Sequence, residues 1–155
     1  MEVPVLGICV GHQFLGRHFG GRVVRGTPEF GAAEITVDRP DHPIFAGLPT
    51  HLKAWSNHND SVVVPPPGWS VLAHSPDCPV QAMAHPTKVI WGVQFHPEVT
   101  LDQVESWIRD PEDPPPDADG LHAATLPRIA AWNELGRELC AGFVEAAERA
   151  ATTSV

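Results

Sequence analysis

Cys9 is the residue of this chain whose type and surroundings best suit covalent chemistry. It lies in the middle of a Gly-Ile-Cys-Val-Gly run, residues 7–11, between a short apolar stretch and a stretch with helical spacing. A nucleophile at such a strand-to-helix turn needs small neighbours, because larger side chains would collide with the packed strand and helix. The helix that follows directs its first amides at the sulfur and favours the thiolate. The sequence therefore predicts a nucleophilic Cys9.

His96 and Glu98 flank Pro97 at the end of an apolar run, residues 89–95, that predicts a strand. Pro97 disfavours helical angles at His96, and residues two apart in an extended chain point to the same side. Glu98 can therefore hold the imidazole ring while the ring activates a thiol. Together with Cys9, the pattern predicts a Cys-His-Glu triad.

Composition limits the other functions open to the chain. Its 155 residues suit one domain, and its 19 acidic against 10 basic residues give a net charge of -9. That charge offers no basic surface for nucleic acid or an anionic membrane. The apolar start, residues 3–10, is too short for a membrane span and lacks the basic flank of a signal peptide. We expect neither a nucleic-acid nor a membrane partner.

The remaining cysteines and histidines predict neither disulfides nor a metal site. Cys78 lies in a predicted turn and Cys140 in a predicted helix, so both are expected to be structural. Three scattered cysteines favour a reducing compartment, and we expect a cytoplasmic protein. The chain has no His-x-x-x-His, Cys-x-x-Cys, P-loop or Gly-x-Gly-x-x-Gly pattern. The sequence therefore predicts no metal ion and no cofactor.

Short apolar runs broken by Pro and Gly predict alternating strands and helices. The predicted strands are 3–9, 33–38, 52–55, 61–64, 70–73, 80–84 and 89–95, and helical spacing appears in 13–19, 101–108 and from Leu126 onward. These elements divide the chain into a catalytic core, a Pro-rich acidic loop, and a C-terminal amphipathic helix with its tail: 1–109, 110–125 and 126–155.

The motifs, taken together, resemble class I glutamine amidotransferases. The elbow run continues into His12 and Gln13, and the later run reads Gly-Val-Gln-Phe-His-Pro-Glu-Val over residues 92–99. Between them lie a Glu-Phe-Gly piece, residues 29–31, and the stretch 55–62, which are similar to the glutaminase branch of GMP synthase. The resemblance implies an α/β fold: a flavodoxin-like, three-layer sheet with flanking helices.

The resemblance also implies roles for individual residues. A triad of Cys9, His96 and Glu98 would hydrolyse the side-chain amide of glutamine through a cysteine thioester, giving glutamate and ammonia. The expected substrate contacts are the Val10 amide for the oxyanion, the Gln13 side chain, and backbone at Asn57 and His58. Asn57 stands where this branch has Ser, which bears on one substrate contact. The implied partner is an ATP-dependent synthetase subunit that accepts the ammonia, with GMP synthesis as the expected use.

Two features leave alternatives open. Family members have strand–helix units ahead of the nucleophile, including a Gly-rich loop that completes the oxyanion hole, so we expect an N-terminally incomplete family domain. The segment beyond about residue 101 is similar to stand-alone relatives and favours a γ-glutamyl hydrolase or peptidase. An incomplete domain favours a catalytically impaired binding or regulatory relative. The glutaminase remains the leading hypothesis.

Overall fold

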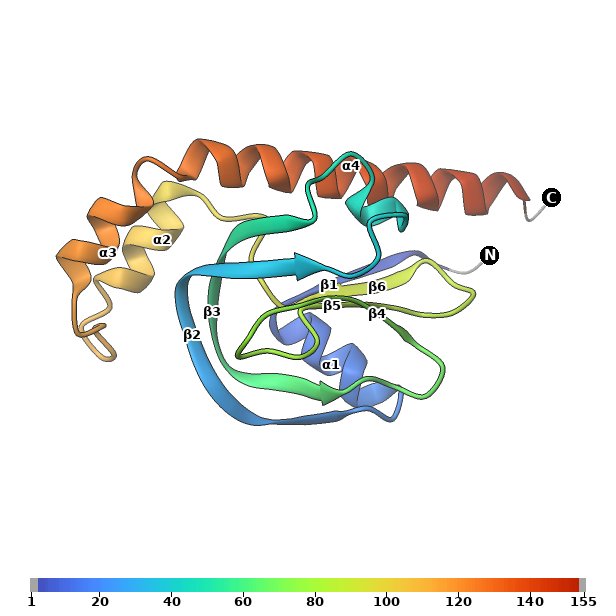
Figure 1. The fold of residues 1–155 in the computed structure, drawn as a ribbon, viewed down its shortest axis with the longest axis horizontal. Coiled ribbons are helices and arrows are strands. Elements are labelled where there is room, and N and C mark those ends of the chain that lie inside the picture. Colours follow the sequence, from blue (N-terminus) through green and yellow to red (C-terminus); the bar gives the residue numbers. More distant parts are fainter. Residues whose placement is uncertain (1–2, 154–155) are drawn as a thin grey trace.

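A six-stranded, strongly curled sheet organises the chain (Figure 1). The computed structural model describes residues 3–153. Its strands are β1 (Val5–Ile8), β2 (Arg22–Val37), β3 (His51–Val64), β4 (Ser70–His74), β5 (Ala82–Ala84) and β6 (Ile90–Val93). Its helices are α1 (Val10–His18), the short 3₁₀ helix η1 (Pro43–Phe45), α2 (Leu101–Ile108), α3 (Ala118–Thr125) and α4 (Ile129–Thr153).

The strand order places the ends of β1 and β6 side by side. The sheet runs β1-β6-β5-β4-β2-β3, and β1 pairs in parallel with β6, with Ile8 opposite Val93. The other pairings among the described strands are antiparallel, so parallel pairing is confined to β1 and β6. Because carboxyl ends of parallel strands meet at one edge, the residues that follow β1 and β6 come together there.

The long pair β2 and β3 differs from the sequence prediction. The separate strands expected at 52–55 and 61–64 are one continuous β3, and β2 begins well before residue 33. Polar residues at 56–60 interrupt the apolar pattern, but backbone ladder bonds to β2 continue through most of them. A register shift between Arg25 and Glu29 accompanies the bend of the pair in Figure 1.

Helices cover the two faces of the sheet. Leu135 and Leu139 of α4 pack with sheet residues in the largest apolar cluster. Leu15 of α1 belongs to a second cluster, with Val62 and Met83 of the sheet. The third cluster surrounds Trp55 and gathers residues of α2, α4 and the β6–α2 connection. The C-terminal helix is therefore part of the main core, because its apolar stripe faces the sheet.

The loop predicted over 110–125 is wrong in its second half. Helix α3 begins at Ala118, and the Asp117 carboxylate accepts a hydrogen bond from the Gly120 amide at 2.9 Å. This cap satisfies one of the amides that a helix start leaves without a partner, so a helix forms directly after the prolines. Helix α4 begins at Ile129, three residues after the predicted start at Leu126.

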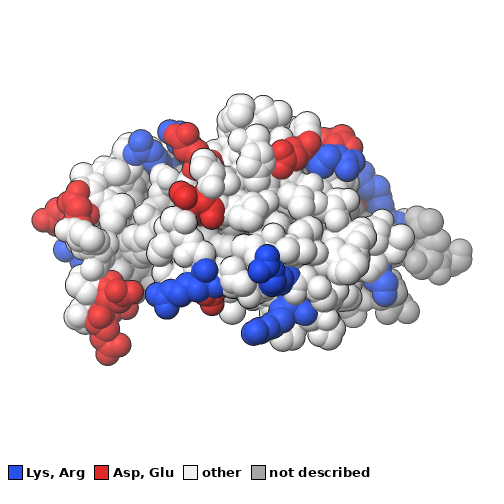
Figure 2. All heavy atoms as spheres, turned by 60° about the horizontal axis from the view of Figure 1, so that its bottom comes forward, with Lys and Arg blue, Asp and Glu red and all other residues white. Residues whose placement is uncertain are grey.

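Between residues 3 and 153, none of the helices is both long and apolar enough to cross a membrane. On the face shown in Figure 2, basic and acidic side chains lie in small separate groups. The basic groups on this face do not merge into one continuous surface. The expected absence of a nucleic-acid partner stays a prediction.

Candidate active site

Cys9 sits between β1 and α1 in a strained backbone conformation. Its φ is 48°, and it is the only non-glycine with a positive φ in the described part of the chain. Such angles cost about 1–3 kcal/mol and persist where the surrounding structure enforces them. A Cβ added at Gly7 would lie 2.7 Å from the Gly11 backbone, as expected for a tight elbow. An added Cβ at Gly11 would meet nothing within 4 Å, so the predicted collision is wrong there.

The Cys9 sulfur has two polar neighbours from distant parts of the chain. Sγ lies 3.7 Å from the Asn57 carbonyl oxygen on β3 and 3.7 Å from the Gln94 side-chain nitrogen after β6. Val10 opens α1, and the first amides of a helix have no acceptor within the helix. The sulfur therefore lies at the positive end of α1, where negative charge is favoured.

His96 and Glu98 form the pair that their spacing predicts. Nδ1 of His96 lies 2.8 Å from Oε1 of Glu98, which leaves Nε2 for Cys9. The His96 amide donates to the Trp55 carbonyl oxygen at 2.8 Å and ties this turn to β3. Burial lowers the pKa of the imidazole, but hydrogen bonds and charge interactions with Cys9 and Glu98 outweigh burial and raise the pKa to about 9. These contacts therefore favour the protonated ring.

Gln13 and Gln94 connect β3 to the sulfur. The Gln13 side-chain nitrogen donates to the Asp60 carbonyl at 2.7 Å and to Oε1 of Gln94 at 3.2 Å. Gln94 in turn donates toward Cys9. Sequence reasoning missed Gln94, although it alternates with His96 and Glu98 along an extended segment and could have been placed on their side of the chain. Gln13 thus lies near the sulfur and is held by protein groups, and its expected substrate contact stays a prediction.

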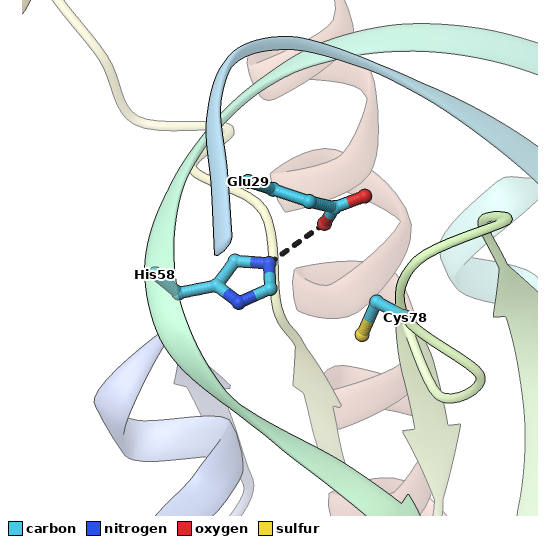
Figure 3. A group of neighbouring side chains, drawn as sticks. All are labelled: Glu29, His58 and Cys78. Atoms are coloured by element: carbon cyan, nitrogen blue, oxygen red, sulfur yellow. Dashed lines mark hydrogen bonds and ion pairs between the residues drawn. The ribbon is translucent and has the colours of Figure 1, made fainter. Parts of the chain in front are cut away.

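The His58 side chain points toward Glu29 in a buried polar cluster (Figure 3). Its Nε2 lies 2.7 Å from Oε2 of Glu29, and its Nδ1 lies 3.1 Å from the Asp60 carbonyl. Both neighbours are acceptors when Glu29 is ionised, so the ring lies between two hydrogen-bond acceptors. Burial alone would raise the pKa of Glu29, but hydrogen bonds from His58 and Ser75 outweigh it and lower the pKa. The His58 ring is thus held by protein groups, and the expected backbone contact of His58 with a substrate stays a prediction.

Cys78 completes the one group in the described chain whose ligand types and spacing could hold a metal ion. Its sulfur and the nearest ligand atoms of Glu29 and His58 all lie within 4.8 Å of one another. Glu29 and His58 already pair with each other, and Ser75 and Gln81 donate to Glu29. Burial raises the pKa of the Cys78 thiol to about 11, which disfavours the thiolate that a metal needs. The predicted absence of a metal stays a prediction.

A cleft of about 230 Å³ opens beside Asn57. The β2–β3 ribbon forms one wall with Glu29 and Phe30, and Trp107 with the acidic, proline-rich segment 110–116 forms much of the other. The Trp107 ring also contacts the His96 ring, with centroids 4.9 Å apart. The segment after residue 100 therefore reaches the site, which its composition did not predict.

A mixed α/β fold that places a cysteine at a strand-to-helix elbow, beside a His–Glu pair, defines a class of cysteine-dependent enzymes acting on acyl or amide groups. The profile described as "Glutamine amidotransferase class-I" matches residues 1–110. The chain belongs to this family.

Its relatives include the glutaminase part of GMP synthase. The chain is 51% identical over 99 residues to the glutamine-hydrolyzing GMP synthase subunit of Thermococcus kodakarensis, a match that covers 63% of this chain and 52% of the relative. It is 51% identical over 98 residues to the glutamine-hydrolyzing GMP synthase of Parafrankia sp., over 63% of this chain and 18% of the relative. The chain spans about half the length of the Thermococcus relative.

The fold likeness extends further along the chain than these sequence matches. A crystal structure of a glutamine amidotransferase from Thermotoga maritima superposes with a TM-score of 0.80 at 26% identity. It covers 92% of this chain and 63% of that protein. The helices after the sheet therefore belong largely to the shared fold.

Proposed function

We propose that this chain is a glutaminase centre, with Cys9 as nucleophile and the His96–Glu98 pair as its proton-transfer partner. One observation carries the proposal: the parallel pairing of β1 with β6 brings an elbow cysteine and a carboxylate-held imidazole to the same sheet edge. A thiolate beside a cationic imidazole is the activated form of a cysteine nucleophile.

The reaction follows from these positions. The Cys9 thiolate attacks the side-chain amide carbon of glutamine, and the carbonyl electron pair moves to the oxygen. The Val10 amide can donate a hydrogen bond to this oxyanion. The tetrahedral intermediate collapses, the C–N bond breaks, and His96 gives its proton to the departing nitrogen, so ammonia leaves. Water then attacks the thioester carbon while His96 takes its proton. The C–S bond breaks, and glutamate and the thiolate are formed.

The remaining site residues suit substrate holding. Gln13 lies one helical turn from Cys9, and its amide can turn from its present acceptors toward a substrate. The Asn57 carbonyl already meets Cys9, which supports the proposed substrate contacts with backbone at Asn57 and His58. Glu98 keeps its place beside Nδ1 and fixes the tautomer of the ring, as the carboxylate of a triad does.

The use of the ammonia follows from the relatives. Because the relatives are GMP synthase subunits, we propose that the partner is an ATP-dependent synthetase subunit and that the ammonia is used in GMP synthesis. The finer fold description, a flavodoxin-like three-layer domain, is supported by the parallel β1–β6 pair and by helices α1 and α4 on opposite faces.

The test is hydrolysis of glutamine by the purified chain, followed as glutamate and ammonia, with γ-glutamyl-p-nitroanilide as a second substrate. Cys9→Ser and His96→Ala are expected to abolish turnover, and Glu98→Gln to slow it while the fold is kept. Hydrolysis of the anilide without hydrolysis of glutamine would favour a γ-glutamyl hydrolase. Full glutaminase rate in His96→Ala would overturn the proposed centre.

A further inference from the structure

Trp107 of α2 lies against the imidazole of His96. The two ring centroids are 4.9 Å apart, and the ring planes are tilted by 53°. Helix α2 starts directly after this turn, where the Thr100 hydroxyl accepts from the Gln103 amide at 3.2 Å. Leu101, Val104 and Ile108 lie at helical spacing along α2, and Trp107 lies on the same inward-facing side of the helix. The contact is thus set by a capped helix and not by a free loop.

The position of Trp107 is fixed independently by β3. Its ring stacks on Trp55, with centroids 6.4 Å apart and planes within 14°. Trp55 is fully buried, and its carbonyl accepts the His96 amide at 2.8 Å. Trp132 of α4 also packs against the Trp55 ring, with the two ring centroids 5.7 Å apart. Trp55 therefore ties the His96 backbone and the Trp107 ring to one rigid strand.

We propose that Trp107 is a positioning residue of the hydrolytic centre, whose indole holds the His96 ring toward Cys9 and favours its protonated form. The inference rests on the proposed glutaminase function. A cation within about 6 Å of an indole ring is attracted by the ring's electron distribution, and a neutral ring gains less. The contact therefore favours the thiolate–imidazolium pair over the uncharged thiol and imidazole.

The groups that act on His96 are few. Glu98, from its own segment, holds Nδ1, and Cys9 faces it from the β1–α1 junction. On the β3 side, His58 points toward Glu29. On the α2 side, Asp110 lines the cleft that Trp107 also lines. Helix α2 adds the aromatic ring of Trp107 to these neighbours of His96.

The expected signature is a loss of Cys9 reactivity that depends on pH. Without the indole, the thiolate–imidazolium pair is less favoured, so alkylation of Cys9 by iodoacetamide slows about two- to fivefold at acidic and neutral pH. At high pH the thiolate forms without help from the imidazolium, so the rates of variant and parent converge. Simple structural damage would lower the rate at every pH.

The experiment measures alkylation of Cys9 in the full chain from pH 5 to 10, by mass spectrometry of its peptide, in a Cys140→Ser background. Trp107→Leu is the test variant, and Trp107→Phe keeps an aromatic face and is expected to recover most of the rate. Trp132→Leu is the matched control, because among the ring contacts of the described residues Trp132 packs on Trp55, whereas Trp107 packs on His96. Thermal unfolding checks that each variant is folded.

The outcomes separate the two proposals. A slowing confined to lower pH in Trp107→Leu, with recovery in Trp107→Phe, supports the inference. An unchanged rate, an equal slowing at all pH values, or the same pH-dependent slowing in Trp132→Leu overturns it. If Trp107→Leu does not fold, Trp107→Met is the non-aromatic variant measured in its place, and an unchanged rate or an equal slowing at all pH values in Trp107→Met also overturns the inference. Because alkylation needs no glutamine, the pH profile tests the contact between Trp107 and His96 separately from turnover, so failure of this inference and failure of the proposed function are distinguished.

Discussion

The side-chain nitrogen of Gln94 lies 3.7 Å from the sulfur of Cys9, although 85 residues separate them in the chain. The side chain of Gln94 is fully buried, and its oxygen accepts from Gln13. The amide is therefore held by the protein and points a donor at the sulfur. A fixed donor stabilises developing negative charge without reorganising when it forms.

Replacing Gln94 by Leu is expected to slow alkylation of Cys9 about 10- to 100-fold at neutral pH, because a hydrogen bond to a charged group contributes about 1.5–3 kcal/mol. The measurement is the second-order rate constant with iodoacetamide, beside the urea midpoint. Gln81→Leu is the matched control: it removes another buried amide that donates to Glu29 and does not contact the sulfur. Equal slowing in both variants would contradict a specific contact of Gln94 with Cys9.

Cys9 is expected to be the first thiol labelled by a limiting amount of a glutamine-like chloroketone. Cys78 is buried and its thiol has a pKa raised to about 11, so little thiolate forms there. Cys140 is exposed on α4 but has no part of the site beside it. Peptide mass spectrometry identifies the labelled residue, and Cys9→Ser is the control. Preferential labelling of Cys78 or Cys140 in folded protein would exclude Cys9 as the nucleophile.

His96 is expected to contribute stability to the fold that is lost as the pH rises from 6.5 through about 9. The folded-state pKa of His96 is raised from 6.5 to about 9. A raised pKa contributes stability that is complete below 6.5 and is lost as the folded group deprotonates. The difference corresponds to at most about 3 kcal/mol, and solvent screening of this partly exposed pair reduces the expected contribution to about 1–2 kcal/mol.

Urea denaturation at pH 6 to 10 measures this loss. In His96→Gln the decline between pH 6.5 and 9 is expected to shrink, whereas His51→Gln, exposed at the start of β3, keeps it. Parallel curves for the parent and His96→Gln would show that the decline has another source.

The lack of a side chain at Gly136 of α4 is expected to be necessary for the position of the turn at Pro97. A Cβ at Gly136 would collide with the Pro97 carbonyl oxygen, between His96 and Glu98. Gly136→Ala is therefore expected to displace this turn and slow Cys9 alkylation, with a net stability loss of about 1–2 kcal/mol from overpacking. Gly142→Ala is the control, because the same helix there meets the Pro43 carbonyl oxygen, in the connection between β2 and β3. Equal alkylation rates in the two variants would contradict the prediction.

Local features of the site were predictable because they depend on residues close in sequence. The elbow around Cys9, the same-side placement of His96 and Glu98, and helix α2 at 101–108 all follow from periods and backbone restrictions that act over a few residues. The structure bears out each of these geometries. Helix α3 was missed because prolines dominate the preceding segment and its cap, Asp117, reads as one more acidic loop residue.

The sequence by itself determined the strand-to-helix cysteine, the His–Glu spacing and the family resemblance. Tertiary structure alone decided that Gln94 donates to the sulfur, that His58 turns inward to Glu29, and that Trp107 covers His96. The physical reason is that periodicity shows which face of an element is buried, whereas the partner on that face depends on strand order and helix docking. Those are set by the packing of the whole sheet, through contacts between residues far apart in the chain.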